Sequence, residues 1–219
     1  MEKAYEYPMD ELTGLPGRDA FEAQLTAWIE KKRRTPVLLS MVVADIDLFG
    51  AINETHGRDG GDRVLCALAS ALQSHLPAPA TVFRFGGDAF AALLPEVEKE
   101  QAFLQMEAFR AAFCVAREIA IGKKTESLVV TVSMGLSTFP DDGAKASDVI
   151  HKANEALYRA KVSGRNKICL AREEKMVTKT SHYMQGQLMG LRRLAEREKI
   201  GEALLLREAL NDLLRKHNA

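Results

Sequence analysis

The sequence of 219 residues is 47% hydrophobic and 27% charged, which is typical of a globular protein with one sizeable core and residues left for a small second module. Thirty basic and thirty acidic residues cancel, so the overall charge argues against a nucleic-acid coat protein and a membrane-surface protein. No apolar run approaches the about 20 residues that span a bilayer, and the polar, acidic start is unlike a secretory signal. We therefore expect a cytoplasmic protein without a membrane partner.

The first part of the sequence alternates between helical and extended patterns. Apolar residues recur at helical spacing from Phe21 to Ile29, which predicts a helix. The continuous apolar run 36–45 predicts a buried central strand that ends in Asp45. Over 62–76, apolar residues share one face and no helix breaker occurs, so a second helix is expected there.

Two short apolar segments, 81–85 and 89–95, flank the Gly86–Gly87 pair and predict a β-hairpin. The alternation of helices and strands continues after this hairpin. We expect, in chain order, a helix over 99–120, a strand over 128–140, a helix over 146–166 and a strand over 167–171. This order indicates an α/β fold with a mixed sheet flanked by helices.

Asp45 and Asp88 are the two carboxylates that this topology can bring together, one at a strand end and one on the hairpin tip. Two carboxylates suit a divalent metal, which offsets the charge of a nucleoside triphosphate. Gly86 and Gly87 lack a Cβ, so the hairpin backbone allows a nucleotide to approach closely. The alternative interpretation is a solvated aspartate beside an ordinary turn.

Five segments, in order, resemble the GGDEF domain, the family of diguanylate cyclases that condense two GTP molecules into cyclic di-GMP. The segments are DELTGLPGR (10–18), DIDLFGAIN with GRDGGD (45–62), RFGGDAF (84–90), VTVSMGLS (130–137) and ANEALYRAKVSGRN (153–166). The resemblance covers residues 1–170. It implies GTP as the nucleotide and Mg²⁺ or Mn²⁺ as the cofactor.

The resemblance also implies roles for single residues near the metal and the base. Asp45, the main-chain carbonyl of Ile46 and Asp88 match the metal-binding positions, and Asp88 is the remaining candidate for a catalytic carboxylate. Asn53 and Asp62 match the positions that read the guanine edge. An amide and a carboxylate complement the donors and acceptors of that edge.

Further residues match the positions that meet the triphosphate. They are the backbone at Phe49 and Gly50, the hairpin glycines Gly86 and Gly87, and the side chains of Lys161 and Arg165. For the two cations, the alternative is an ordinary solvated helix end, where positive charge favours the helix dipole.

The departures from the family pattern are equally informative. Ala89 stands where the fourth motif position is normally Glu, and Gly50 stands where Lys is usual. The RxxD product-binding motif that the family often carries upstream of the hairpin reads Pro-Ala-Pro-Ala at 77–80. We therefore expect a domain that binds GTP or a related guanine nucleotide but cyclises it poorly or not at all. The alternative is an active diguanylate cyclase.

The tail over 171–219 is expected to form a second module. Amphipathic patterns predict helices over 187–199 and 202–217, with a break at Ile200-Gly201. Two helices of this size cannot bury their apolar faces alone, so we expect them to dimerise or to dock on the first domain. A homodimeric regulator follows from this interpretation.

The same tail resembles the ribbon-helix-helix fold, in which paired strands enter the major groove of double-stranded DNA. The matching strand would place Thr178, Thr180 and His182 toward the groove. The alternative is a helical hairpin that only dimerises, and then holds two catalytic domains together if the cyclase is active.

Overall fold

The computed structural model describes residues 7–32, 38–115, 117–121, 124–171 and 183–198. In the last part of the chain it also describes Glu202, Leu205, Leu206, Ala209, Leu210, Leu213 and Lys216. The chain divides into two compact units, Met1–Glu173 and Glu174–Ala219. The assignment of these units to a nucleotide-binding domain and a DNA-binding tail stays a prediction.

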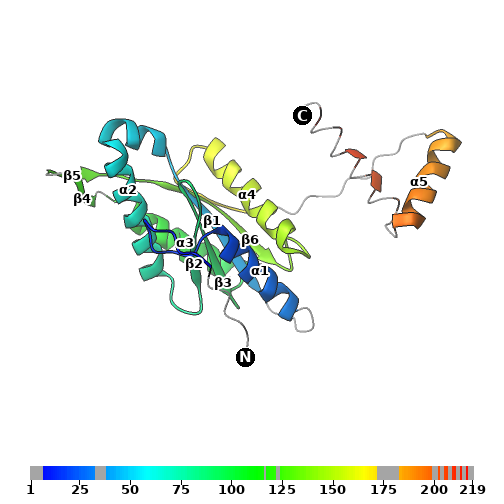
Figure 1. Cartoon of the computed structure of the whole chain (residues 1–219), viewed down its shortest axis with the longest axis horizontal. Helices are drawn as coiled ribbons and strands as arrows, with labels where there is room; N and C mark the ends of the chain where they lie inside the picture. Colours follow the sequence, from blue (N-terminus) through cyan, green and yellow to red (C-terminus); the bar gives the residue numbers. More distant parts are fainter. Residues whose placement is uncertain are drawn as a thin grey trace. The chain divides into compact units, whose positions relative to one another are not determined.

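A five-stranded sheet with the order β2-β3-β1-β6-β7 forms the centre of the first unit (Figure 1). Its strands are β1 (Leu39–Ile46), β2 (Thr81–Gly86), β3 (Ala89–Pro95), β6 (Val132–Phe139) and β7 (Ile168–Leu170). All neighbours are antiparallel except β6 and β7, which are parallel. The mixed sheet confirms the predicted α/β fold.

Helices cover both faces of this sheet. They are α1 (Arg18–Lys32), α2 (Phe49–His75), α3 (Lys99–Phe113) and α4 (Ala146–Val162). Val42, Ala44 and Ile46 of β1 belong to the core that includes α2 and α3, whereas Met41 and Val43 belong to the core that includes α1 and α4. Because both faces are covered, the central strand is a continuous apolar run.

The helix predicted over 62–76 begins much earlier, at Phe49. The reason is a kink at Gly57, whose φ of 69° and ψ of 177° interrupt the helix without ending it. A positive φ favours glycine, because a Cβ would clash with the backbone there. The glycines around this kink are typical of a loop, although the chain is helical on both sides of it.

A second difference is the hairpin formed by β4 (Arg117–Ile121) and β5 (Lys124–Leu128), which extends beyond the main sheet (Figure 1). The helix predicted over 99–120 ends at Phe113, its last buried residue, and the strand predicted over 128–140 begins at Val132. Ile119, Ile121 and Thr125 in this segment are β-branched residues, which favour strands.

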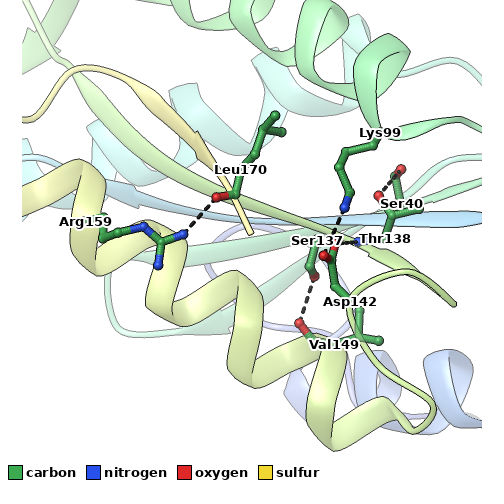
Figure 2. Close-up of polar contacts among 8 residues, drawn as sticks. All are labelled: Ser40, Lys99, Ser137, Thr138, Asp142, Val149, Arg159 and Leu170. Atoms are coloured by element: carbon green, nitrogen blue, oxygen red, sulfur yellow. Dashed lines mark hydrogen bonds and ion pairs between the residues drawn. The ribbon is translucent and has the colours of Figure 1, made fainter. Parts of the chain in front are cut away.

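Helix α4 lies very close to β6. A Cβ on Gly135 would collide with the backbone of α4, so only glycine allows this approach. Ser137 Oγ donates a 2.7 Å hydrogen bond to the Val149 carbonyl, and Arg159 Nη2 donates a 2.8 Å bond to the Leu170 carbonyl (Figure 2). These contacts fix the position of α4 along the sheet, and therefore the position of its C-terminal end.

Figure 2 also shows a buried ion pair near the start of α4. Lys99 Nζ lies 2.9 Å from Asp142 Oδ1, and Asp142 Oδ2 accepts a 2.7 Å hydrogen bond from the Thr138 amide. Ser40 Oγ is 3.1 Å from Thr138 Oγ1. This network joins α3 to the loop that leads from β6 into α4.

The second unit contains α5 (Gln185–Glu198), which agrees with the helix predicted over 187–199. The residues described between 202 and 216 are all helical. Thr178, Thr180 and His182 lie outside the described residues, so the ribbon strand stays a prediction. No helix in the described parts of the chain is long and apolar enough to span a membrane.

Candidate functional site

The end of β1 meets the tip of the β2–β3 hairpin. Asp45 is paired with Ala89 of β3 on one side and with Ser133 of β6 on the other. The Ile46 amide donates a 3.4 Å hydrogen bond to the Asp88 carbonyl. The structure therefore brings together Asp45, Ile46 and Asp88, the three positions predicted to bind a metal.

The hairpin tip is open to a ligand. Gly86 and Gly87 have φ values of 146° and 52°, a region that favours glycine. No atom lies within 4 Å of a Cβ built on either residue. The ladder shifts register between Arg84 and Gly86, and such a bulge re-aims the chain at a strand end. The backbone here is free to be approached closely, as the sequence predicts.

Asp45 is a buried carboxylate whose closest charged neighbour is a lysine. Its Oδ1 lies 2.5 Å from Lys161 Nζ but makes no well-aligned hydrogen bond with any described residue. Burial raises the pKa of the Asp45 carboxyl above 3.8, and the negative charge of Asp88 adds to this effect, while Lys161 opposes it. Lys161 already supplies positive charge at this oxygen, and a metal ion bound there would take the place of its ammonium group.

The residues at this point fit Mg²⁺ or Mn²⁺. Two carboxylates and a main-chain carbonyl are hard oxygen ligands of the kind that Mg²⁺ prefers, and Mg²⁺ sites are usually completed by water and substrate phosphates. No group of three or more His, Cys, Asp or Glu that could hold a metal occurs among the described residues. Asp45, Ile46 and Asp88 would therefore share the ion with the nucleotide.

The residues predicted to read guanine lie on the two sides of the kink in α2. Asn53 is half-buried in the first segment, and Asp62 is exposed in the second. A Cβ on Gly61 would collide with Asn53 Oδ1 and would lie 3.1 Å from Phe49 Cζ. Gly61 thus gives space to the Asn53 amide, which the sequence alone did not indicate.

The start of α2 presents backbone to the same end of the sheet. Leu48, with φ 56° and ψ 33°, is the left-handed residue from which the helix begins. Phe49 is half-buried and Gly50 is exposed. Helix N-terminal amides favour anions, which is consistent with the phosphate contact predicted for these two residues.

Lys161 lies in the last turn of α4, and Arg165 lies in the turn that follows this helix. Lys161 contacts Asp45, as described above. Arg165 is exposed, has φ 60°, and its amide donates a 3.0 Å hydrogen bond to the Ala160 carbonyl. Of the two predicted phosphate-facing cations, Lys161 is thus held beside a predicted metal ligand, whereas Arg165 is exposed in the turn after α4.

Sequence reasoning gave no role to Asp47, although it lies two residues from Asp45. Asp47 is only 5% exposed and accepts hydrogen bonds from Thr131 Oγ1, Ser133 Oγ and the Asn166 amide. The signal in the sequence was the alternation Asp-Ile-Asp at a strand end, which places both acids on one face of the sheet.

A second missed group anchors the hairpin tip. Arg84 Nη2 donates to the Gly87 carbonyl, and Arg84 Nη1 lies 3.6 Å from Asp10 Oδ2. Asp10 Oδ2 accepts from the amide (2.8 Å) and the hydroxyl (2.5 Å) of Thr13. Burial acts to raise the pKa of Asp10, but the Thr13 bonds and the Arg84 charge lower it overall. The DELTGLPGR segment is therefore a brace for the hairpin.

Comparison with known proteins agrees with this geometry. The sequence profile of the family "Diguanylate cyclase, GGDEF domain" matches residues 8–167. Diguanylate cyclase DgcP of Pseudomonas aeruginosa is 36% identical over 163 residues, which are 74% of this chain and 24% of that protein. Diguanylate cyclase DgcZ of Escherichia coli is 32% identical over 179 residues, 78% of this chain and 56% of that protein.

Response regulator PleD of Caulobacter vibrioides is 32% identical over 159 residues, 73% of this chain and 35% of that protein. The chain thus spans about a quarter to a half of the length of these curated relatives. Their full-length activities therefore do not transfer to it directly.

Solved structures are similar over the same part of the chain. The coiled coil and GGDEF domain of DgcB from Caulobacter crescentus, in complex with c-di-GMP, has a TM-score of 0.70 and 29% identity over 74% of this chain and 85% of that one. The active GGEEF domain of a diguanylate cyclase from Vibrio cholerae has a TM-score of 0.65 and 30% identity over 72% of this chain and 98% of that one.

Proposed function

The chain belongs to the GGDEF family of diguanylate cyclases, and we propose that it binds GTP with Mg²⁺ or Mn²⁺ but has lost most or all of its capacity to cyclise it. The nucleotide would lie between the end of β1, the β2–β3 hairpin, the start of α2 and the end of α4. The protein would then act through its nucleotide-bound state rather than by making cyclic di-GMP.

The observation that carries this proposal is the pairing of Asp45 with Ala89. Directly opposite residues of an antiparallel pair project from the same face with Cβ atoms about 5 Å apart. A glutamate at position 89, usual in the family, would place a further carboxylate beside Asp45. Ala89 presents a methyl group instead, so one of the charges that stabilise the metal and the reacting groups is missing.

The rest of the site supports retained binding. Asn53 and Asp62 remain for the guanine edge, and the glycines of the hairpin leave space for the nucleotide. Lys161 and Arg165 would contact the triphosphate. When the metal is bound to Asp45, Lys161 would contact a phosphate oxygen instead of Asp45. Asp45, Ile46 and Asp88 would hold the metal, which supplies the charge that offsets the triphosphate.

The second unit is proposed to join two chains, because helices with exposed apolar residues in so small a unit are not stable alone. Leu188, Leu210 and Leu213 are 44%, 54% and 54% exposed. Binding of double-stranded DNA through Thr178, Thr180 and His182 has no support in the described residues and is not part of the proposal.

Calorimetric titration of the full chain with GTP, with and without Mg²⁺, tests this function. We expect Mg²⁺-dependent binding that weakens at least about tenfold in Asp88→Asn, which removes one metal ligand without changing side-chain shape. Asp19→Asn, at an exposed position of α1, serves as the matched control because it makes the same change of charge. Unchanged affinity in Asp88→Asn would overturn the placement of the metal, and absence of GTP binding in the wild type would overturn the function.

A further inference from the structure

Asp47 is the most completely bonded side chain at the end of β1. Its Oδ1 accepts from Ser133 Oγ at 2.6 Å, and its Oδ2 accepts from Thr131 Oγ1 at 2.8 Å and from the Asn166 amide at 2.9 Å. The Asp47 amide also donates to the Thr131 carbonyl at 2.9 Å. One carboxylate therefore ties together β1, the start of β6 and the turn that follows α4.

Asn166 extends this connection to α3. Its Oδ1 accepts a 2.7 Å hydrogen bond from Arg110 Nη1, and its Nδ2 donates to Cys114 Sγ at 3.3 Å. Arg110 is itself held by two hydrogen bonds to Glu107, of 2.9 and 2.6 Å. Asn166 has φ 45°, and Asn adopts this left-handed conformation more readily than most residues. The turn is therefore held from two sides.

Asp45 contacts the last turn of α4, whereas Asp47 contacts the turn that follows this helix. Asp45 contacts the flexible side chain of Lys161, which can leave it. Asp47 contacts a backbone amide, which moves only if the whole turn moves. Asp45 can therefore release its partner when a ligand binds, whereas Asp47 keeps the turn that carries Arg165 in place.

We infer that Asp47 is a positioning residue for nucleotide binding: it holds the 163–166 turn so that Lys161 and Arg165 reach the phosphates. The inference rests on the proposed function. All three partners of the Asp47 side chain are donors, and only a carboxylate offers acceptors alone. An asparagine has one acceptor oxygen in place of two and carries no charge. It keeps the Asn166 amide only if its NH₂ group turns toward one of the two hydroxyls, so the bond that holds the turn becomes weaker.

The test compares GTP and GMP, because only the phosphate contacts should depend on the turn. Full-length wild type, Asp47→Asn and Ser137→Ala are titrated with each nucleotide in excess Mg²⁺. Ser137→Ala removes a buried hydrogen bond at the other end of α4 and controls for loss of stability. We expect Asp47→Asn to lose at least about tenfold in GTP affinity and less than about twofold in GMP affinity.

The ratio of the two affinities separates positioning from a merely structural role. Ser137→Ala is expected to lower the melting temperature and leave the ratio unchanged. If Asp47→Asn leaves the ratio of GTP affinity to GMP affinity unchanged, the inference is overturned while the proposed function stays intact. Wild type without GTP affinity would overturn both.

A milder variant covers the case in which Asp47→Asn does not fold. Thr131→Val removes one of the three donors to Asp47 and keeps the β-branched shape of the side chain. We expect its GTP affinity to fall about threefold with GMP affinity unchanged, and an unchanged ratio in this variant would also count against Asp47.

Discussion

Asp45 on β1 lies directly opposite Ala89 on β3 in the antiparallel ladder, and the two side chains project from the same face of the sheet. Lys161 approaches Asp45 from α4, with 2.5 Å between its Nζ and Oδ1. The site therefore has one buried acid, one lysine and one methyl group where the family pattern has a further acid. Its chemistry depends on this difference.

Replacing Ala89 with Glu should restore the missing carboxylate. Position 89 is only partly buried, so the longer side chain has access to solvent and to the nucleotide. We expect Ala89→Glu to tighten Mg²⁺-dependent GTP binding and to raise formation of cyclic di-GMP at least about tenfold over the wild type. Chromatography of the reaction mixture measures the product.

Ala89→Gln is the matched control for that substitution, because it has the same size without the charge. If the glutamine variant gained as much affinity as the glutamate variant, packing rather than charge would be the cause.

Gly61→Ala should weaken recognition of the base. Its Cβ would collide with Asn53 Oδ1 and crowd Phe49, so the amide that is proposed to read guanine must move. We expect the preference for GTP over ATP to fall about tenfold, as measured by competition binding. Gly17→Ala is the control, since the nearest atom to its Cβ is the Pro8 carbonyl oxygen at 3.9 Å. A full preference retained in Gly61→Ala would contradict the role of Asn53.

The contact between Asp45 and Lys161 should appear as a coupling in stability. Asp45→Asn, Lys161→Met and the double variant form a thermodynamic cycle, measured by urea unfolding without nucleotide. We expect a coupling of about 1 kcal/mol, limited by solvent because the Lys161 side chain is 34% exposed. If the loss of stability in the double variant equals the sum of the two single losses within about 0.3 kcal/mol, the ion pair contributes nothing to stability.

Asp45 should also make the free energy of unfolding depend on pH. Burial raises its folded pKa above 3.8, with Asp88 adding and Lys161 opposing. A raised folded pKa favours folding at low pH, and that contribution is lost as pH rises through the folded value. The free energy of unfolding of the wild type, relative to Asp45→Asn, should therefore fall as the pH rises above about 4. A difference that stays constant over this range would contradict the burial of the charge.

The strands of the sheet were predictable because both faces are covered, which leaves uninterrupted apolar runs such as 36–45. The start of α2 was not, since Gly57, Gly60 and Gly61 are typical of a loop. Gly57 instead supports a kink and Gly61 makes room for Asn53. The β4–β5 hairpin was also missed, because its short strands follow a helix without a clear break in the amphipathic pattern.

The positions predicted to bind metal and phosphate could be proposed from the sequence because local motifs carry them. The hydrogen bonds of Asp47 could not, because its partners Thr131 and Asn166 are 84 and 119 residues away in the sequence. The same holds for the brace between Arg84 and Asp10. Tertiary contacts of this kind are fixed only when the strands have paired.

Incubation of the full chain with GTP and Mg²⁺, followed by quantitative chromatography for cyclic di-GMP, tests the central claim most directly. The account predicts that GTP is bound and recovered unchanged, with product at or near the level of a blank. Sustained production of cyclic di-GMP over many turnovers by the wild-type chain would contradict it, and would identify the protein as an active cyclase despite Ala89.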